Sequence, residues 1–445
     1  MQGFLLVLIC CVMSSDFVVY SLGLPSVMHF IPELMSGVVI VYVLIFGTRD
    51  HFRLVAPKYW LVFGALAFVM LCGIILNGTG AGPIISGMRF YLRGVPIFFL
   101  AAVLPITDVH LRRQFKWLLA LAFIQVPLTG YQRWVVMSQG RFTGDDVHGT
   151  VLDSGVLTMF LVCAVFILTG LLLKHRLSKL LYCVLFLLLL IPTTINETKV
   201  TVVFLPLGLL VTVLLGAARG KRLTYAGIGL TVLIAFGAVF IPVYDMMQAH
   251  NPYKIKIVDF FTNEKALNNY LAVSNKNSEA GIGRTKLAGR GDSIVVPLAY
   301  LARDPVDLAF GLGLGNVSPS NLGRNFEGAY FRLFRSVLVT SFAYFTLEFG
   351  LIGVLLIGCL FCVIFMDAVR VARLDQGLTG ALAAGWTGVM ALFALATVYN
   401  VFFQFASVTY LYWYFAGVIA ARGVALGYQA AQVPTRSPRA KTATA

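Results

Sequence analysis

Long apolar stretches, each close to the length of a membrane-crossing helix, make up most of this 445-residue chain. A helix needs about 20 apolar residues to cross the hydrocarbon core of a bilayer. The apolar stretches divide into twelve such segments, at 3–22, 26–47, 59–78, 84–106, 115–136, 150–173, 178–196, 199–217, 223–245, 338–369, 379–402 and 405–425. The pattern therefore predicts an all-α, polytopic membrane protein with about twelve crossings.

One long polar and basic segment, at 246–337, interrupts this pattern between the ninth and tenth crossings. It predicts a large loop outside the membrane with amphipathic helices, one of them at 253–270 where apolar and polar residues alternate. The chain then divides into a nine-crossing membrane domain at 1–245, this loop, a three-crossing domain at 338–425 and a basic, disordered tail at 426–445. The first crossing lacks a basic leader and a small-residue cleavage site, so we expect it to stay uncleaved.

Composition and charge support this class and give the chain an orientation. Hydrophobic residues make up 59% of the chain and charged residues only 12%, which is outside the range of soluble domains. Lys and Arg collect in the connections after the even-numbered crossings, and the short connections after the odd-numbered ones are mostly free of them. The positive-inside rule then predicts cytoplasmic termini and an outer large loop. The net charge of +15 is explained in part by anchoring to the inner leaflet, so nucleic-acid binding is not implied.

Two residue classes narrow the search for chemistry. All seven cysteines fall inside predicted crossings, where they act as small apolar residues, so no disulfide framework or metal site is predicted. Ionisable residues inside crossings are costly unless they are paired or face a wet cavity. They are Asp16, Glu33, Arg89, Arg93, Arg133, Asp153, Glu197, Lys199 and Glu348. Singly, each can be an interfacial residue or part of a structural ion pair. Together, and with Arg89 and Arg93 on one helix face, they favour an anion-binding cavity near the outer surface.

Three outer segments carry the sharpest local signals. The segment between the fifth and sixth crossings places turn glycines beside Arg141, Asp145, Asp146 and His148. A tight turn at 196–199 sets Lys199 at the start of the eighth crossing. The large loop carries Arg290 ahead of a Gly-Leu-Gly-Leu-Gly-Asn stretch at 311–316, which is no dinucleotide fingerprint because no βαβ strand precedes it.

A fourth segment, at 325–335, mixes aromatic and basic residues, namely Tyr330, Phe331, Arg332, Phe334 and Arg335. Aromatic rings beside cations can stack on sugars and line a groove for an acceptor. The same residues also fit an aromatic belt at the lipid interface leading into the tenth crossing. The sequence leaves both interpretations open.

In this order, the motifs resemble those of the O-antigen ligase and Wzy-type polysaccharide polymerase superfamily. An Arg-x-x-Gly motif after the fifth crossing corresponds to Arg141 and Gly144, and a Ser-Arg pair opening a later crossing corresponds to Thr198 and Lys199. The family also has about twelve crossings, cytoplasmic ends and one large periplasmic loop late in the sequence. The resemblance covers most of residues 60–425.

Two further motifs of that family lie in and after the large loop. An Arg ahead of a Gly-x-Gly turn corresponds to Arg290 with the glycines of 311–315, and a Glu-x-Gly-Leu-Ile-Gly helix start corresponds to Glu348, Gly350 and Gly353. The chain departs from the family in two respects. Lys199 replaces an Arg and loses the bidentate fork that suits phosphate. No histidine follows His250, although ligases carry one after the glycine turn, and this favours a polymerase.

The resemblance implies a bacterial inner-membrane glycosyltransferase with a fold related to the GT-C transferases. Such an enzyme transfers a glycan from undecaprenyl pyrophosphate to a hydroxyl of another lipid-linked repeat unit at the periplasmic face, without metal or cofactor. The expected catalytic cations, which stabilise the departing diphosphate, are Arg141, Lys199 and Arg290. The residues expected to bind the pyrophosphate or glycan are Arg89, Arg93, His148, Tyr330, Arg332 and Arg335. A general base is open among Asp145, Asp146, His148 and Asp292.

Three alternatives remain beside a polymerase of exopolysaccharide or O-antigen. The first is a ligase that transfers glycan to lipid A-core or another acceptor. The second is a transporter of polysaccharide or lipid-linked sugar, although matched halves with broken midplane helices are not visible in the sequence. The third is a scaffold subunit of an export complex. Chain-length regulators and export proteins are the expected protein partners of the polymerase.

Overall fold

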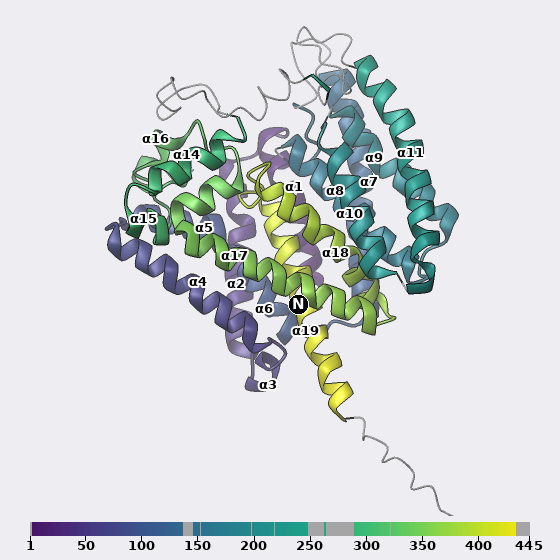
Figure 1. The fold of residues 1–445 in the computed structure, drawn as a ribbon, viewed down its shortest axis with the longest axis horizontal. Helices are drawn as coiled ribbons and strands as arrows, with labels where there is room; N and C mark the ends of the chain where they lie inside the picture. The colour runs from purple at the N-terminus through teal and green to yellow at the C-terminus, as the bar shows by residue number, and fades with distance from the viewer. Residues whose placement is uncertain are drawn as a thin grey trace, which may run out of the picture.

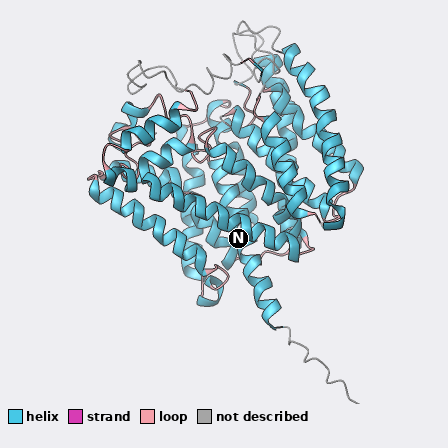
Figure 2. Ribbon diagram, in the orientation of Figure 1, coloured by secondary structure: helices cyan, strands magenta, loops and turns pink. Residues whose placement is uncertain are grey.

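The computed structural model describes residues 2–136, 146–151, 153–196, 198–217, 219–247, 262–263, 289–320 and 322–432. Within these ranges every regular element is a helix (Figure 2), so the all-α prediction is confirmed. Nearly all of the amphipathic helix expected at 253–270 lies outside the described residues. The last helix continues to Gln432, into the segment predicted as a tail, and the remainder of that tail also lies outside them.

A helix overlaps each apolar segment that the sequence indicates. The helices are α1 (Gln2–Tyr20), α2 (Ile31–Phe46), α4 (Pro57–Leu76), α5 (Ala81–Leu92) with α6 (Val95–Val103), α7 (Asp108–Tyr131), α8 (Ser154–Leu173), α9 (Lys179–Ile195), α10 (Thr201–Gly216), α11 (Arg222–Met247), α17 (Ser341–Leu374), α18 (Leu378–Thr397) and α19 (Ala406–Gln432). A short helix, α3 (Arg49–Phe52), joins α2 to α4.

Length and composition qualify seven of the described helices to cross a membrane, or eight if the bent pair α5–α6 forms one crossing. The seven are α1, α2 with the 3-10 turn before it, α4, α8, α11, α17 and α18. Helices α9 and α10 are apolar but shorter, at 17 and 16 residues. The chain therefore carries the apolar helices of a membrane protein, and its full number of crossings belongs to the proposal below.

Polar side chains at segment ends determine where several helices begin. The side chain of Asp153 accepts a 2.8 Å hydrogen bond from the backbone N–H of Val156, which caps α8. Thr340 caps α17 in the same way through Ala343, at 3.2 Å. Such caps satisfy backbone donors that have no partner within the helix, which fixes the first turn in place.

Helix α18 is the centre of the bundle and packs against α8, α10 and α17. Figure 1 shows α7 to α11 on one side of the molecule and α2, α4, α5 and α6 on the other, with α17, α18 and α19 between them. Small residues allow the close contacts at the centre. A Cβ on Gly170 or Gly385 would meet the backbone of the facing helix, so α8 and α18 touch almost backbone to backbone.

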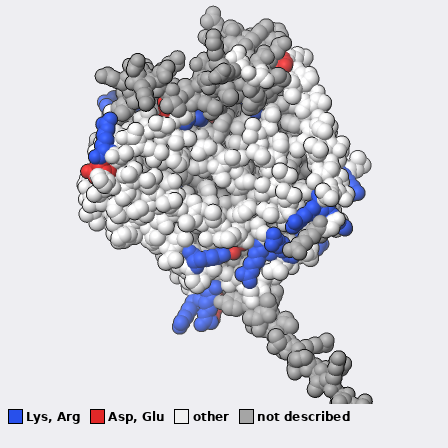
Figure 3. All heavy atoms as spheres, in the orientation of Figure 1, with Lys and Arg blue, Asp and Glu red and all other residues white. Residues whose placement is uncertain are grey.

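The connections after the even-numbered segments lie together at one end of the molecule. There, Lys174 donates 2.5 Å to the carbonyl of Ala372, and Arg422 pairs with Asp375 at 2.6 Å. Gln2 at the N-terminus reaches the carbonyl of Pro105 at the same end. Figure 3 shows Lys and Arg gathered around this end, where α3 and the last helix project. The alternation of charge along the sequence is therefore matched by an alternation in space.

The connection after the third segment and the end of the eleventh segment meet the region 289–340 at the opposite end: Asn77 donates to the carbonyl of Gly311, and Arg290 donates to that of Tyr399. This region contains α14 (Asp292–Leu301), α15 (Pro305–Phe310), the 3-10 turn η6 (Arg324–Phe326) and α16 (Phe331–Phe334). Its own apolar core includes Leu301, Val317 and Phe334, and continues into α17 through Leu347. The region is thus packed onto the membrane helices by its core.

Candidate functional site

Four segments that are distant in sequence meet at the loop-bearing end of the bundle. They are the starts of α8 and α10, the residues before α14, and the turn after α18 at Tyr399 and Asn400. Asn400 donates 3.2 Å to Asp153 at the start of α8, and its carbonyl accepts from the N–H of Ser341 at 3.1 Å. We call this meeting point the junction. The junction brings Arg290, from the third outer segment of the sequence analysis, close to the starts of α8 and α10. These two starts directly follow the first and second outer segments.

Arg290 enters the junction from the region before α14. Its Nε donates a 3.3 Å hydrogen bond to the carbonyl of Tyr399, and its guanidinium lies 5.5 Å from the centre of the Tyr399 ring. That ring in turn meets Phe204 of α10 edge to face, at 5.4 Å between centroids. A short chain of contacts therefore connects Arg290 to the first turns of α10, directly after Lys199.

Lys199 lies in the turn before α10 and is half-buried. The turn is held by Asn196, whose amide donates to the carbonyl of Ser154 and to the hydroxyl of Thr158, both at 3.0 Å. Among the described residues, the buried hydroxyls of Thr198 and Thr201 on either side of Lys199 have no hydrogen-bond partner. Buried polar atoms rarely lack a hydrogen-bond partner in folded proteins, so this turn can receive a polar group of a ligand.

The loop after α7 is described only from residue 146 onward, so Arg141 and Asp145 lie outside the described residues. Gly149, with φ 62°, exchanges two hydrogen bonds with the side chain of Gln132, at 2.8 and 2.9 Å. His148 beside it has a buried Nδ1 with no partner among the described residues. The loop is thus fastened to α7 immediately before it delivers Asp153 to the junction.

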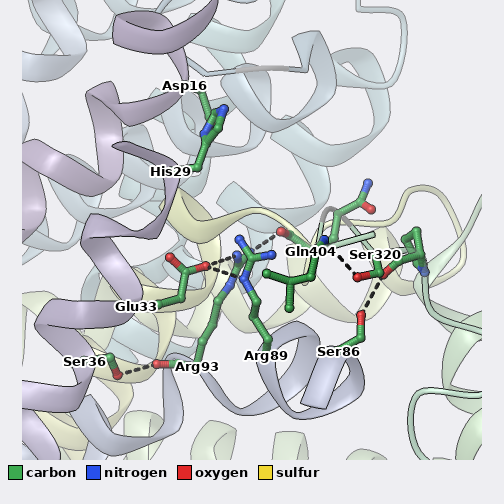
Figure 4. Close-up of polar contacts among 11 residues, drawn as sticks. Asp16, His29, Glu33, Ser36, Ser86, Arg89, Arg93, Ser320 and Gln404 are labelled. Atoms are coloured by element: carbon green, nitrogen blue, oxygen red, sulfur yellow. Dashed lines mark hydrogen bonds and ion pairs between the residues drawn. The ribbon is translucent and has the colours of Figure 1, made fainter. Parts of the chain in front are cut away.

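Arg89 and Arg93 form a second cluster, in which both arginines bind the same carboxylate oxygen. Nε of Arg89 lies 3.1 Å and Nη1 of Arg93 lies 3.4 Å from Oε1 of Glu33 on α2 (Figure 4). Arg93 also donates to the carbonyl of Gln404, between α18 and α19. The shared face expected from their spacing is therefore present. Within this contact two positive charges face one negative charge, and the Asp16 carboxylate near Arg93 supplies a second negative charge, so the cluster is close to charge balance.

The Arg93 side of this cluster lies at a break in the helix. Helices α5 and α6 meet at 50°. The hydroxyl of Ser36 donates 2.6 Å to the carbonyl of Arg93, which satisfies a backbone group that an unbroken helix would have used. A Cβ on Gly94 would press on Trp413 and Thr409 of α19, so glycine permits the close approach at the bend.

A second ion pair, between Asp16 and His29, lies near this cluster (Figure 4), at 3.2 Å between Oδ1 and Nδ1. Within the described ranges, several buried polar atoms around these residues have no hydrogen-bond partner, namely His29 Nε2, Glu33 Oε2, Arg93 Nε and Tyr410 Oη. The cluster therefore offers both donors and acceptors to a polar ligand.

The glycine turn at 311–315 and the helix start at Glu348 are joined directly. The three glycines adopt φ of 73°, 92° and 84°, which favours residues without a side chain. Glu348 is fully buried and accepts hydrogen bonds from the N–H of Gly315 and Val317 and from the hydroxyl of Ser318, at 2.8 to 3.0 Å. These two motifs of the sequence thus form one structural clasp.

The mixed segment at 325–335 divides its residue types between two sides. Phe334 is fully buried and meets Tyr300 edge to face at 4.9 Å, and Tyr330 packs against the same core. Arg332 and Arg335 are exposed, and Arg332 pairs with Glu327 at 3.4 Å. Phe334 therefore serves the core of the region, and the arginines provide its charged surface.

Sequence reasoning found several charged members of these clusters but not the neutral ones. Asn196, Asn400 and Tyr399 hold the junction together, and no pattern of charged residues singles them out because their side chains carry no charge. Asparagine close to the end of an apolar segment is the signal that could have found two of them.

No protein-family model matches the chain, and no curated protein matches it significantly in sequence. The resemblance therefore rests on the motifs alone.

Proposed function

We propose that this protein is a membrane-embedded glycosyltransferase of the Wzy-type polymerase and O-antigen ligase superfamily. It spans the bacterial inner membrane twelve times, with both termini in the cytoplasm and the 246–337 loop in the periplasm. It transfers a growing glycan from undecaprenyl pyrophosphate to a hydroxyl of another lipid-linked repeat unit. The helix at each apolar segment and the gathering of basic connections at one end support this topology.

The observation that carries the proposal is the junction. Arg290 and the Lys199 turn come from segments about ninety positions apart, and Tyr399 and Phe204 connect them at the end that bears the large loop. These are two of the three positions where the family motifs place cations. The third, Arg141, belongs to the loop whose last residues reach the junction through Asp153.

The chemistry follows from charge. When the bond between the anomeric carbon and the pyrophosphate oxygen breaks, negative charge develops on the diphosphate. Fixed cations in a site of low dielectric stabilise this charge more than water does. Lys199 and Arg290 fill this role together with Arg141, and the Arg89 and Arg93 face supplies a further place for the pyrophosphate. The acceptor hydroxyl loses its proton as it attacks, which a base in the 145–148 segment or Asp292 can take.

The test is to reconstitute the protein with lipid-linked oligosaccharide from its host and resolve the products by length. The wild type should give a ladder that Lys199→Gln and Arg290→Gln lack, and Lys199→Arg should retain activity because it keeps the charge. Arg303→Gln, which removes an exposed cation from the same region, is the matched control and should leave the ladder unchanged. A ladder unaffected by both Gln variants would refute the catalytic assignment, and failure of the wild type to extend glycans would refute the polymerase.

A ligase is the nearest alternative, since it uses the same donor and differs in the acceptor. The absence of histidine after His250 favours the polymerase. Supplying lipid A-core as acceptor distinguishes the two, because a ligase would then form a single conjugate in place of a ladder.

A transporter is the second candidate, and the break between α5 and α6 favours it. Interrupted helices with charged groups at the break form the substrate sites of many transporters, and here the break carries Arg93 against Glu33. Movement of labelled lipid-linked sugar across the vesicle membrane without extension of the glycan would support transport.

A further inference from the structure

The end of the bundle opposite the junction contains a hollow lined by basic side chains. It lies where α8, α10, α11 and α17 end or begin. Its basic lining residues are Lys174, His175, Lys221, Arg222 and Arg373. None of the described residues that line it is acidic. The hollow is therefore a concentration of positive charge that is separate from both clusters described above.

Hydrogen-bond contacts hold two basic side chains of this hollow in place. Nζ of Lys221 lies within hydrogen-bond distance of Nε2 of His175, at 3.4 Å, and His175 takes the left-handed φ of 56°. Lys174 is half-buried and donates to two neutral acceptors, the carbonyl of Ala372 at 2.5 Å and the side chain of Gln376 at 3.2 Å. Burial lowers the pKa of Lys174, an effect that the charge of Asp375 opposes. Four lysine and arginine side chains line the hollow, so an anion bound there would be stabilised by their charge.

An apolar groove begins where the basic hollow ends. It runs along α8, α9, α10 and α11, and Leu173 and Tyr225 line both the hollow and the groove. Its other lining residues include Leu172, Leu209, Val213, Gly229 and Leu233. A cationic hollow continuous with an apolar groove matches a molecule that is anionic at one end and hydrocarbon at the other.

We propose that this composite site binds an anionic phospholipid, with the headgroup phosphate in the basic hollow and an acyl chain in the groove along α11. The hollow lies at the end rich in Lys and Arg, where anionic lipid headgroups are attracted by the charge of the protein. Free phosphate would use only the hollow and leave the groove without a role. The site is independent of the catalytic proposal, because it lies at the other end of the bundle and involves none of its residues.

Native mass spectrometry of the detergent-purified protein, titrated with phosphatidylglycerol or phosphatidylcholine, tests this inference. We expect one phosphatidylglycerol to bind in clear preference to phosphatidylcholine. The double variant Lys221→Gln, Arg373→Gln should weaken phosphatidylglycerol binding on the order of 30-fold, given the usual contribution of each cation near a lipid headgroup. The control Arg112→Gln, Arg113→Gln removes two exposed cations outside the hollow and should bind as the wild type does.

The groove is tested separately by a bulky residue on α11. Gly229 lines the groove and Gly227, two positions before it, does not, although a Cβ at either glycine meets no neighbour. Gly229→Trp should therefore weaken binding, and Gly227→Trp should not. Equal binding of the two lipids would overturn the proposal without any variant. Full displacement of phosphatidylglycerol by equimolar inorganic phosphate would also overturn it, since the groove would then contribute nothing.

Discussion

Oε2 of Glu348 accepts a 2.8 Å hydrogen bond from the backbone N–H of Gly315, a residue 33 positions earlier in the chain. The other carboxylate oxygen accepts from Val317 and Ser318. One buried side chain thus organises the glycine turn and ties it to the first turns of α17. Because every donor involved is itself buried, none of them can turn to water if the carboxylate is removed.

We predict that Glu348→Gln destabilises the fold. An amide in this position would direct its NH₂ group at one or more N–H or O–H donors, and an unsatisfied buried donor costs roughly 1–3 kcal/mol. Thermal unfolding followed by tryptophan fluorescence in detergent measures the change. Thr346→Val is the matched control, since the Thr346 hydroxyl is buried without a partner in the described structure and its loss should cost little. Equal midpoints for the two variants would contradict the role of the clasp.

Alanine substitutions at Gly315 and Gly323 should distinguish the cost of backbone strain from the cost of steric overlap. Both have a positive φ, 84° and 118°, but a Cβ on Gly315 would overlap the carbonyl of Pro83 on α5, and a Cβ on Gly323 meets nothing within 4 Å. Gly323→Ala should cost only the conformational strain, about 1–3 kcal/mol. Gly315→Ala should cost a further 1–3 kcal/mol or so from the overlap. The difference in unfolding free energy between the two variants measures the cost of the overlap with Pro83. No difference would mean that α5 moves away at no measurable cost.

Removing Glu33 should cost more than breaking an exposed ion pair. Glu33→Ala leaves Arg89 and Arg93, which are 22% and 10% exposed, facing each other without their shared carboxylate. The loss of one partner from a largely buried pair costs on the order of 3 kcal/mol. Glu327→Ala breaks the pair with Arg332, which is 71% exposed, and should cost less than about 1 kcal/mol. Chemical unfolding in mixed micelles compares the two, and similar losses would argue against a desolvated cluster.

Asp153 should be coupled energetically to Asn400. Asp153→Ala removes the cap of α8, a loss of about 1 kcal/mol, and also releases the amide of Asn400. The variant should therefore be less damaging when Asn400→Ala is already present, and a double-mutant cycle on unfolding free energy reports this coupling. Ser178→Ala, which removes the exposed cap of α9, provides the comparison and should be additive with Asn400→Ala.

The helices were predictable because lipid leaves the backbone of a crossing segment little choice but to form helix. The bend between α5 and α6 was not placed, although Gly94 followed by Val-Pro at 95–96 is a signal for a new helix start. Periodicity treats a broken and an unbroken apolar run alike. Helix α17 also continues to Leu374, beyond the expected end at 369. Polar residues such as Asp367 and Arg370 do not by themselves end a helix.

The candidate site was predictable only in its charged residues. Arg89 and Arg93 share a face because four positions make about one helical turn, and this follows from sequence spacing. Their partner Glu33 lies on another helix, and the contact of Arg290 with Tyr399 joins residues 109 positions apart. Such pairings depend on how helices pack, which no local pattern records.

The close packing of the outer region on α4 and α5 has a practical consequence for imaging this protein. Gly82 of α5 lies directly against the backbone of Asn325 and Phe326, and Gly313 lies against the backbone of Gly73 of α4, so the outer region is packed closely on both helices at these points. A short exposed tip at 322–324 directly precedes the contact at Asn325. An antibody fragment that recognises this exposed tip would bind beside a region packed closely on the membrane helices, which makes the tip a suitable place for a fiducial in electron microscopy.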